Sequence, residues 1–180
     1  MIRSILHRVI RSFERRYDYD ATYMREIADT SVGAFAKLAL SQPMNTHREG
    51  VSLDALYAAR LTAVRFEDCG PCAQLVVNMA LEAGVEAAQV RAIVARDEAR
   101  MSADALIGMR LADAVLAHES TDTARTAALA RFGEKGLISL AYTIACTRIY
   151  PTMKRALGHA HACERLRVGG ESVIAARAAA

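Results

Sequence analysis

The chain of 180 residues has no tryptophan, only 6% aromatic residues, and few residues that interrupt helices, with three prolines and ten glycines. Its hydrophobic content of 53% comes largely from alanine and the aliphatic residues. Long runs of β-branched and aromatic residues, which are typical of strands, are scarce. A chain of this length makes about one domain. These absences argue against a β-rich fold and favour an all-α domain.

The sequence also lacks a large excess of charge and a long apolar run. The formal net charge of +3 is too small to indicate nucleic-acid binding, so we expect no nucleic-acid partner. The longest apolar run, over residues 137–146, is about half as long as a membrane span requires. No secretory signal is visible, and the four cysteines do not suggest a disulfide framework. We therefore expect a cytoplasmic protein.

Apolar residues recur at helical spacing along almost the whole chain, which predicts a series of helices. Ser52 and Ser102 are expected N-caps, and Pro151 is expected to kink or restart a helix. We expect residues 1–44 to form a helical extension, residues 45–168 the main all-α domain, and residues 169–180 a C-terminal tail. The expected helices cover residues 2–13, 20–40, 53–66, 69–83, 86–95, 102–118, 120–133 and 134–150, with breaks at 41–45 and a charged loop at 96–100.

The first helix is basic and amphipathic, with an apolar stripe that includes Ile2, Ile5, Val9 and Ile10. Such a helix can lie on an anionic membrane, or it can pack its stripe on the protein core or on a second subunit. Soluble oligomers need large apolar interfaces, so we expect packing rather than membrane binding.

The stretch Cys69-Gly70-Pro71-Cys72 is the most informative motif, because it runs directly into the apolar segment 73–81. This pattern predicts two thiols on the first turn of a buried helix. The helix dipole and free backbone N–H groups there favour a thiolate. Two cysteines three residues apart can also close a disulfide, so the sequence favours a redox pair.

Two other interpretations of the motif remain open. A zinc site would need further ligands, for which His159, His161 and Cys163 are the candidates. The cysteines could also be inert core residues, as we expect for Cys146. Within the same predicted helix, Gln74, Asn78 and Glu82 form one polar stripe. Gln74 and Asn78 can line a pocket beside the thiols, but such a stripe more often faces solvent or another subunit.

The tetrapeptide CGPC also occurs in thioredoxins, but there it follows a strand, and here a helix is predicted before it. From about residue 45 to residue 167 the chain instead resembles the AhpD-like (alkylhydroperoxidase D / carboxymuconolactone decarboxylase) superfamily. The resemblance lies in the helix 53–66 that leads into Asp68-Cys69-Gly70-Pro71-Cys72, the apolar helix that ends at Leu81-Glu82-Ala83-Gly84-Val85, the helix 102–118, and the segment 149–158.

The resemblance implies an AhpD-like helical bundle, with the CxxC at the start of a central buried helix, that assembles as a homo-oligomer. It also implies reduction of small hydroperoxides without metal, flavin or nucleotide. Cys72 would attack the peroxide, Cys69 would resolve the sulfenic acid, and an external thiol or disulfide reductase would restore the pair. Family members that act as lactone-acid decarboxylases generally lack the dithiol.

The chain departs from the family pattern at two positions that carry the proton relay. Tyr57 stands where the peroxidase motif has a glutamate, and Val76 where it has a histidine. Tyr57 can orient or donate a hydrogen bond, whereas Glu67, close to Cys69 in sequence, is a candidate base or a solvated residue. Asp68 is the expected N-cap of the thiol helix. The alternative function is a non-catalytic or redox-sensing oligomer that lacks this relay.

Overall fold

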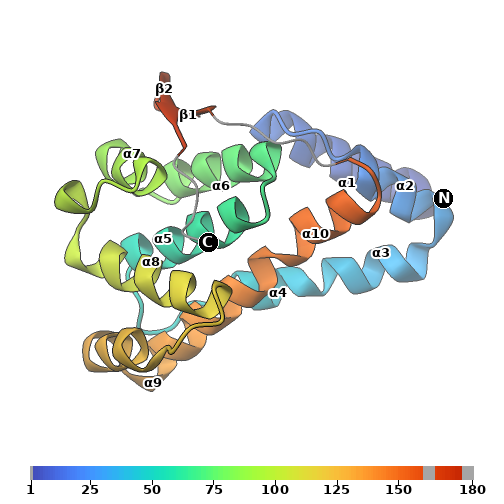
Figure 1. Ribbon diagram of the computed structural model, residues 1–180. Coiled ribbons are helices and arrows are strands. Elements are labelled where there is room, and N and C mark those ends of the chain that lie inside the picture. The colour runs from blue at the N-terminus through green and yellow to red at the C-terminus, as the bar shows by residue number, and fades with distance from the viewer. Residues whose placement is uncertain (1, 160–164, 176–180) are drawn as a thin grey trace.

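The computed structural model describes residues 2–159 and 165–175, and this part of the chain is mostly helical, as expected for the all-α class (Figure 1). Within these ranges the elements are α1 (Ile2–Tyr17), α2 (Thr22–Thr30), α3 (Val32–Ala39), α4 (Ser41–Asn45), α5 (Leu53–Phe66), α6 (Gly70–Glu82), α7 (Ala87–Ala95), the 3₁₀ turn η1 (Glu98–Arg100), α8 (Ala103–Leu116), α9 (Asp122–Thr147), α10 (Ile149–Ala156), β1 (Arg165–Val168) and β2 (Glu171–Ile174).

Helix α5 lies at the centre and begins at the predicted cap, where the Ser52 hydroxyl accepts a hydrogen bond from the Ala55 N–H at 3.3 Å. Helix α8 begins in the same way at Ser102. The two helices approach closely because α8 carries Gly108, where an added Cβ would lie only 2.1 Å from the carbonyl oxygen of Ala55. This contact lets α5 be buried on nearly all sides.

The prediction of a single helix over residues 20–40 is wrong, because the helix is interrupted at Ser31. The backbone of Ser31 is extended, with φ −151°, and its hydroxyl caps α3 by accepting a hydrogen bond from the Ala34 N–H. A serine can satisfy free N–H groups at a new helix start, which makes the break favourable. The predicted break at residues 41–45 is also wrong, since these residues form the short helix α4.

The predicted break at Gly133 is confirmed. Gly133 has φ 68° and ψ −176°, so α9 consists of two helical parts joined across a kink. Positive φ is readily adopted by glycine, which explains why the change of direction occurs there. A further restart precedes Pro151, which lies in the first turn of α10.

Within the C-terminal tail expected for residues 169–180, the described residues add a strand that is not predicted from the sequence, because β1 and β2 form an antiparallel hairpin. Gly169 and Gly170 make the turn and both have positive φ, 58° and 89°. Leu166 and Val168 of β1 are 1% and 0% exposed and pack in the core with residues of α6 and α7. The hairpin covers one side of the thiol helix, as Figure 1 shows beside α6 and α7.

The N-terminal helices pack on the rest of the chain. Arg16 and Tyr17 at the end of α1 both donate hydrogen bonds to Glu82 of α6. The apolar stripe of α1 is divided, because Ile10 is 3% exposed while Ile2, Ile5 and Val9 are more than half exposed. Among the described helices, none is long and apolar enough to span a membrane.

Candidate functional site

The two cysteines of the CGPC motif lie at the first turn of α6 and are joined by a disulfide, with their Cα atoms 5.3 Å apart. Cys69 is the N-cap residue and Pro71 lies in the first turn, where its missing N–H costs no helical hydrogen bond. The expected cap Asp68 is wrong: it has φ 49° and lies one residue before the cap. Cys69 and Cys72 are 1% and 4% exposed, so both sulfurs are buried.

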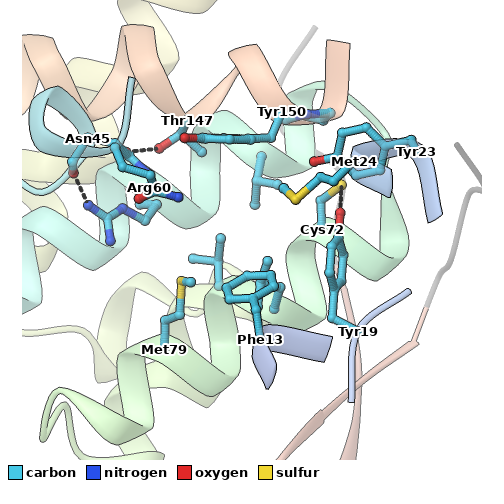
Figure 2. Close-up of a pocket in the computed structure, with 15 residues that line it drawn as sticks. Phe13, Tyr19, Tyr23, Met24, Asn45, Arg60, Cys72, Met79, Thr147 and Tyr150 are labelled. Atoms are coloured by element: carbon cyan, nitrogen blue, oxygen red, sulfur yellow. Dashed lines mark hydrogen bonds between the residues drawn. The ribbon is translucent and has the colours of Figure 1, made fainter. Parts of the chain in front are cut away.

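Cys72 lines a cavity enclosed by α6, α5, the N-terminal helices and the junction of α9 and α10 (Figure 2). The cavity has a volume of about 50 Å³. One water needs ~10–15 Å³ on the same measure, so the cavity has room for more than one water. Cys69 is not among the described residues that line it. The lining residues are Phe13, Tyr19, Tyr23, Met24, Gln42, Asn45, Arg60, Val64, Cys72, Leu75, Val76, Met79, Thr147, Tyr150 and Pro151.

Tyr19 is the polar group that contacts the Cys72 sulfur. Its hydroxyl lies 3.7 Å from Cys72 Sγ, at hydrogen-bond distance for sulfur (Figure 2). Burial raises the pKa of Tyr19 to about 12. The hydroxyl therefore keeps its proton near neutral pH, so Tyr19 can act as a hydrogen-bond donor to the sulfur but not as a base.

A buried lysine holds Tyr19 in place. Lys154 of α10 is 1% exposed, and its ammonium group lies 4.5 Å from the centre of the Tyr19 ring and 5.7 Å from that of Tyr23. The ammonium also donates a hydrogen bond to the Asp20 carbonyl at 3.0 Å. Burial lowers the pKa of Lys154. Cation–π contacts and this hydrogen bond thus fix the turn that carries Tyr19.

Glu67, the candidate base, is engaged elsewhere. Its carboxylate accepts hydrogen bonds from Arg148 Nε at 2.5 Å and from the Thr152 hydroxyl at 3.3 Å, and its side chain is 12% exposed. Glu67 is not among the described residues that line the cavity. The carboxylate instead connects the end of α5 to α9 and α10.

Tyr57 also lies away from the cavity lining. It is 7% exposed, and the Arg60 guanidinium lies 5.0 Å from the centre of its ring. Burial raises the pKa of Tyr57, which makes it a still poorer base. Of Tyr57 and Val76, only Val76 lines the cavity, and its side chain cannot carry a proton.

The polar stripe on α6 is not among the described residues that line the cavity, so the expectation of a pocket lining is wrong, whereas Glu82 does lie at the surface, with 44% of its side chain exposed. The Gln74 side chain exchanges two hydrogen bonds with the backbone of Arg167 in β1. Asn78 donates to the Tyr17 carbonyl of α1, and Glu82 accepts from Arg16 and Tyr17. The stripe therefore holds the hairpin and α1 against the thiol helix.

No group of three or more potential metal ligands is found within residues 2–159 and 165–175. His159 pairs with Glu26 at 2.8 Å. His161 and Cys163, which the zinc interpretation also needs, lie outside the described residues. Cys146 is a buried free thiol, and burial raises its pKa.

Sequence reasoning finds Cys72 but misses Tyr19 and Arg60. Tyr19 comes from the turn between α1 and α2, 53 positions before Cys72, and no local pattern indicates that these two side chains meet. Arg60 gives one signal, a charged residue on the otherwise apolar helix 53–66. No protein-family model matches the chain, and no curated protein or solved structure matches it either.

Proposed function

We propose that this protein reduces small hydroperoxides by cycling Cys69 and Cys72 between dithiol and disulfide. The observation that carries the proposal is the unequal placement of the two sulfurs. Cys72 faces a cavity large enough for a small molecule, whereas Cys69 is buried at bonding distance from Cys72. This arrangement suits an attacking sulfur that meets the substrate and a resolving sulfur that does not.

The cycle has three balanced steps. The Cys72 thiolate attacks the terminal oxygen of ROOH, the O–O bond breaks, and RO⁻ leaves, taking a proton to become ROH. Cys72 is then a sulfenic acid, which the Cys69 thiol attacks, forming the disulfide and releasing water. An external dithiol donates two electrons and two protons to restore both thiols, and is itself oxidised to a disulfide.

Two features of the site support the first step. The positive end of α6 favours the thiolate, and the Tyr19 hydroxyl can donate a hydrogen bond to it. The same hydroxyl can then donate to the oxygen that leaves. Tyr19 would thus supply part of the proton relay that Tyr57 and Val76 do not supply. For this role the geometry favours Tyr19 over Glu67.

The resemblance of residues 45–167 to the AhpD-like superfamily agrees with this chemistry. In keeping with it, the proposal includes a homo-oligomer, a cytoplasmic setting, and an external thiol or disulfide reductase as electron donor. The exposed side chains Ile2, Ile5 and Val9 of α1 offer an apolar surface of the kind that a second subunit covers.

A redox sensor is the second candidate function. Both cysteines are at most 4% exposed, and neither relay position carries an ionisable group suited to move a proton near neutral pH. A sensor needs only slow oxidation, because it acts once per signal rather than once per substrate molecule. Slow disulfide formation without turnover would favour this function.

The test is peroxide consumption with excess dithiothreitol, measured on the reduced protein and on Cys72→Ser, Cys69→Ser and Cys146→Ser. We expect turnover in the parent protein and in Cys146→Ser, and none in Cys72→Ser. In Cys69→Ser, dimedone should trap a sulfenic acid on the peptide that holds Cys72. Equal slow rates in the parent and in Cys72→Ser would end the peroxidase proposal.

A further inference from the structure

Arg60 is a buried cation on the wall of the cavity. It lies in the middle of α5 and is 5% exposed. It is the one charged side chain among the described lining residues. A guanidinium keeps its charge even when burial lowers its pKa, as it does here. The site therefore holds a positive charge that has been removed from water.

The contacts of Arg60 leave this charge without an acidic partner. One amino group donates a hydrogen bond to the Asn45 carbonyl at 2.5 Å, and the guanidinium lies over the Tyr57 ring. The Nε–H is buried and has no hydrogen-bond partner. No aspartate or glutamate within the described residues forms an ion pair with Arg60, in contrast to Arg148, which pairs with Glu67.

A second polar group in the cavity also lacks a full hydrogen bond among the described residues. The Tyr23 side chain is fully buried, and its hydroxyl interacts with the neighbouring Tyr19 hydroxyl only at a geometry short of a full hydrogen bond. Buried polar atoms are rarely left unsatisfied, so the Arg60 Nε–H and the Tyr23 hydroxyl call for a partner that the described residues do not supply, either water or a bound ligand. Figure 2 shows that Arg60, with Asn45 and Thr147, lies at one end of the cavity, and that Tyr23, Tyr19 and Cys72 lie at the other.

Apolar side chains occupy the space between these two ends. Phe13, Leu75 and Met79 line the cavity, and Phe13 and Met79 are seen along one side of it in Figure 2. A ligand that fits has an anionic group at one end, a hydrocarbon middle, and a polar oxygen group near Cys72. One guanidinium balances a single negative charge and matches the planar geometry of a carboxylate. A phosphate dianion would need a second cation, which the described lining does not supply.

We propose that Arg60 binds the carboxylate of a carboxylic-acid substrate, and that this substrate is a short hydroperoxy acid whose peroxide group reaches Cys72. The nature of the substrate rests on the proposed hydroperoxide reduction, whereas the carboxylate site does not. Arg60 is thus a specificity-determining residue that selects an acid over its uncharged ester.

The carboxylate site is tested on the disulfide form, without catalysis. Ligand-observed NMR measures binding of butyrate and of methyl butyrate to the parent protein, Arg60→Gln, Arg60→Lys and Arg8→Gln. Arg8 is an exposed arginine of α1, so its variant matches the change in net charge. We expect butyrate to bind at least tenfold more tightly than its ester, a preference lost in Arg60→Gln, retained in part in Arg60→Lys, and unchanged in Arg8→Gln.

Three results would overturn the carboxylate site: equal affinity of the parent protein for butyrate and its ester, no binding of butyrate at millimolar concentration, or an unchanged preference in Arg60→Gln. Circular dichroism and the intact disulfide show that each variant is folded. Because the comparison of acid with ester in the parent protein involves no substitution, a variant that fails to fold leaves the test intact.

A kinetic measurement then separates the two proposals. The ratio of kcat/KM for a cumene hydroperoxide carrying a para carboxylate to that for its methyl ester should exceed ten in the parent protein. It should fall towards one in Arg60→Gln and stay high in Arg8→Gln. Turnover of both compounds without preference overturns the substrate class alone. Selective binding of butyrate without any turnover overturns the peroxidase function and leaves the acid site standing.

Discussion

Replacing Tyr19 with phenylalanine removes the hydroxyl beside Cys72 and leaves the ring that packs on its neighbours. The ring keeps its edge-to-face contact with Phe13 at 5.9 Å and its cation–π contact with Lys154 at 4.5 Å. The hydroxyl lies 3.7 Å from the sulfur, and the Tyr19 side chain is buried, so its hydrogen bond is shielded from bulk water. A hydrogen bond to a charged acceptor contributes about 1.5–3 kcal/mol. The thiolate population near neutral pH should therefore fall roughly 10- to 100-fold in Tyr19→Phe.

The assay is the rate at which iodoacetamide alkylates reduced Cys72, measured in a background in which Cys69 is serine, with the modified peptide identified by mass. Because burial raises the pKa of Tyr19 to about 12, its hydroxyl stays protonated at every pH of the assay. Tyr142→Phe is the matched control, since Tyr142 packs against His47 and is not among the described lining residues. An alkylation rate in Tyr19→Phe equal to that of the parent would refute the role assigned to the hydroxyl.

Three further predictions concern stability and the charges near the site. Gly108→Ala should lower the free energy of unfolding, measured by urea denaturation, by about 1–3 kcal/mol, because its Cβ would clash with a backbone carbonyl of α5. The control is Gly33→Ala, which should be neutral or stabilising because the nearest atom to its added Cβ lies at 3.9 Å. Glu67→Gln should lower stability by about 1 kcal/mol through loss of the Arg148 pair but leave peroxide turnover intact. In Lys154→Met, the free energy of unfolding should gain less from a rise in pH towards 10.5 than it does in the parent protein.

The sign of the last prediction follows from proton binding. The pKa of Lys154 is lowered by burial in the folded protein, below its ordinary value of 10.5. The unfolded chain therefore binds more protons than the folded chain in the range just below that value, so stability gains from a rise in pH. Identical pH profiles for the parent and Lys154→Met, measured by thermal unfolding, would contradict it. For Glu67→Gln, loss of turnover without loss of stability would restore Glu67 as a base.

Local patterns in the sequence predict the central helices closely. The expected helix 53–66 coincides with α5, and the expected helix 69–83 differs from α6 (Gly70–Glu82) by one residue at each end. Both depend on information carried within the segment, namely a serine cap or a Gly-Pro start followed by apolar residues at helical spacing. The disulfide distance between Cys69 and Cys72 follows from the same local geometry.

The hairpin is missed although its signal is present. Residues 165–168 alternate arginine with leucine and valine, and Gly169-Gly170 is a favoured two-residue hairpin turn. Each strand has only four residues, too few for the alternation to be distinguished from a helix end. Packing of Leu166 and Val168 on α6 and α7 settles the strand conformation.

The cavity could not be predicted, because its walls come from segments far apart in the chain. The helical period indicates that Tyr23 points inward, but not that its hydroxyl faces Cys72's cavity. Arg60 is conspicuous in the sequence as a charge within an apolar helix, yet an ion pair is the usual explanation for such a residue. Only the packed structure reveals that the described residues supply no such pair.

The origin of the cavity walls has a consequence for how such a protein can diversify. The thiol helix supplies the reactive sulfurs, while Phe13, Tyr19, Tyr23 and Met24, all upstream of α4, supply much of the facing wall. Mutations in the first thirty residues can therefore reshape what enters the pocket without disturbing the thiol turn itself. Replacing the N-terminal segment while keeping the helices that carry the thiols is therefore a direct route to a changed substrate selectivity with the same thiol chemistry.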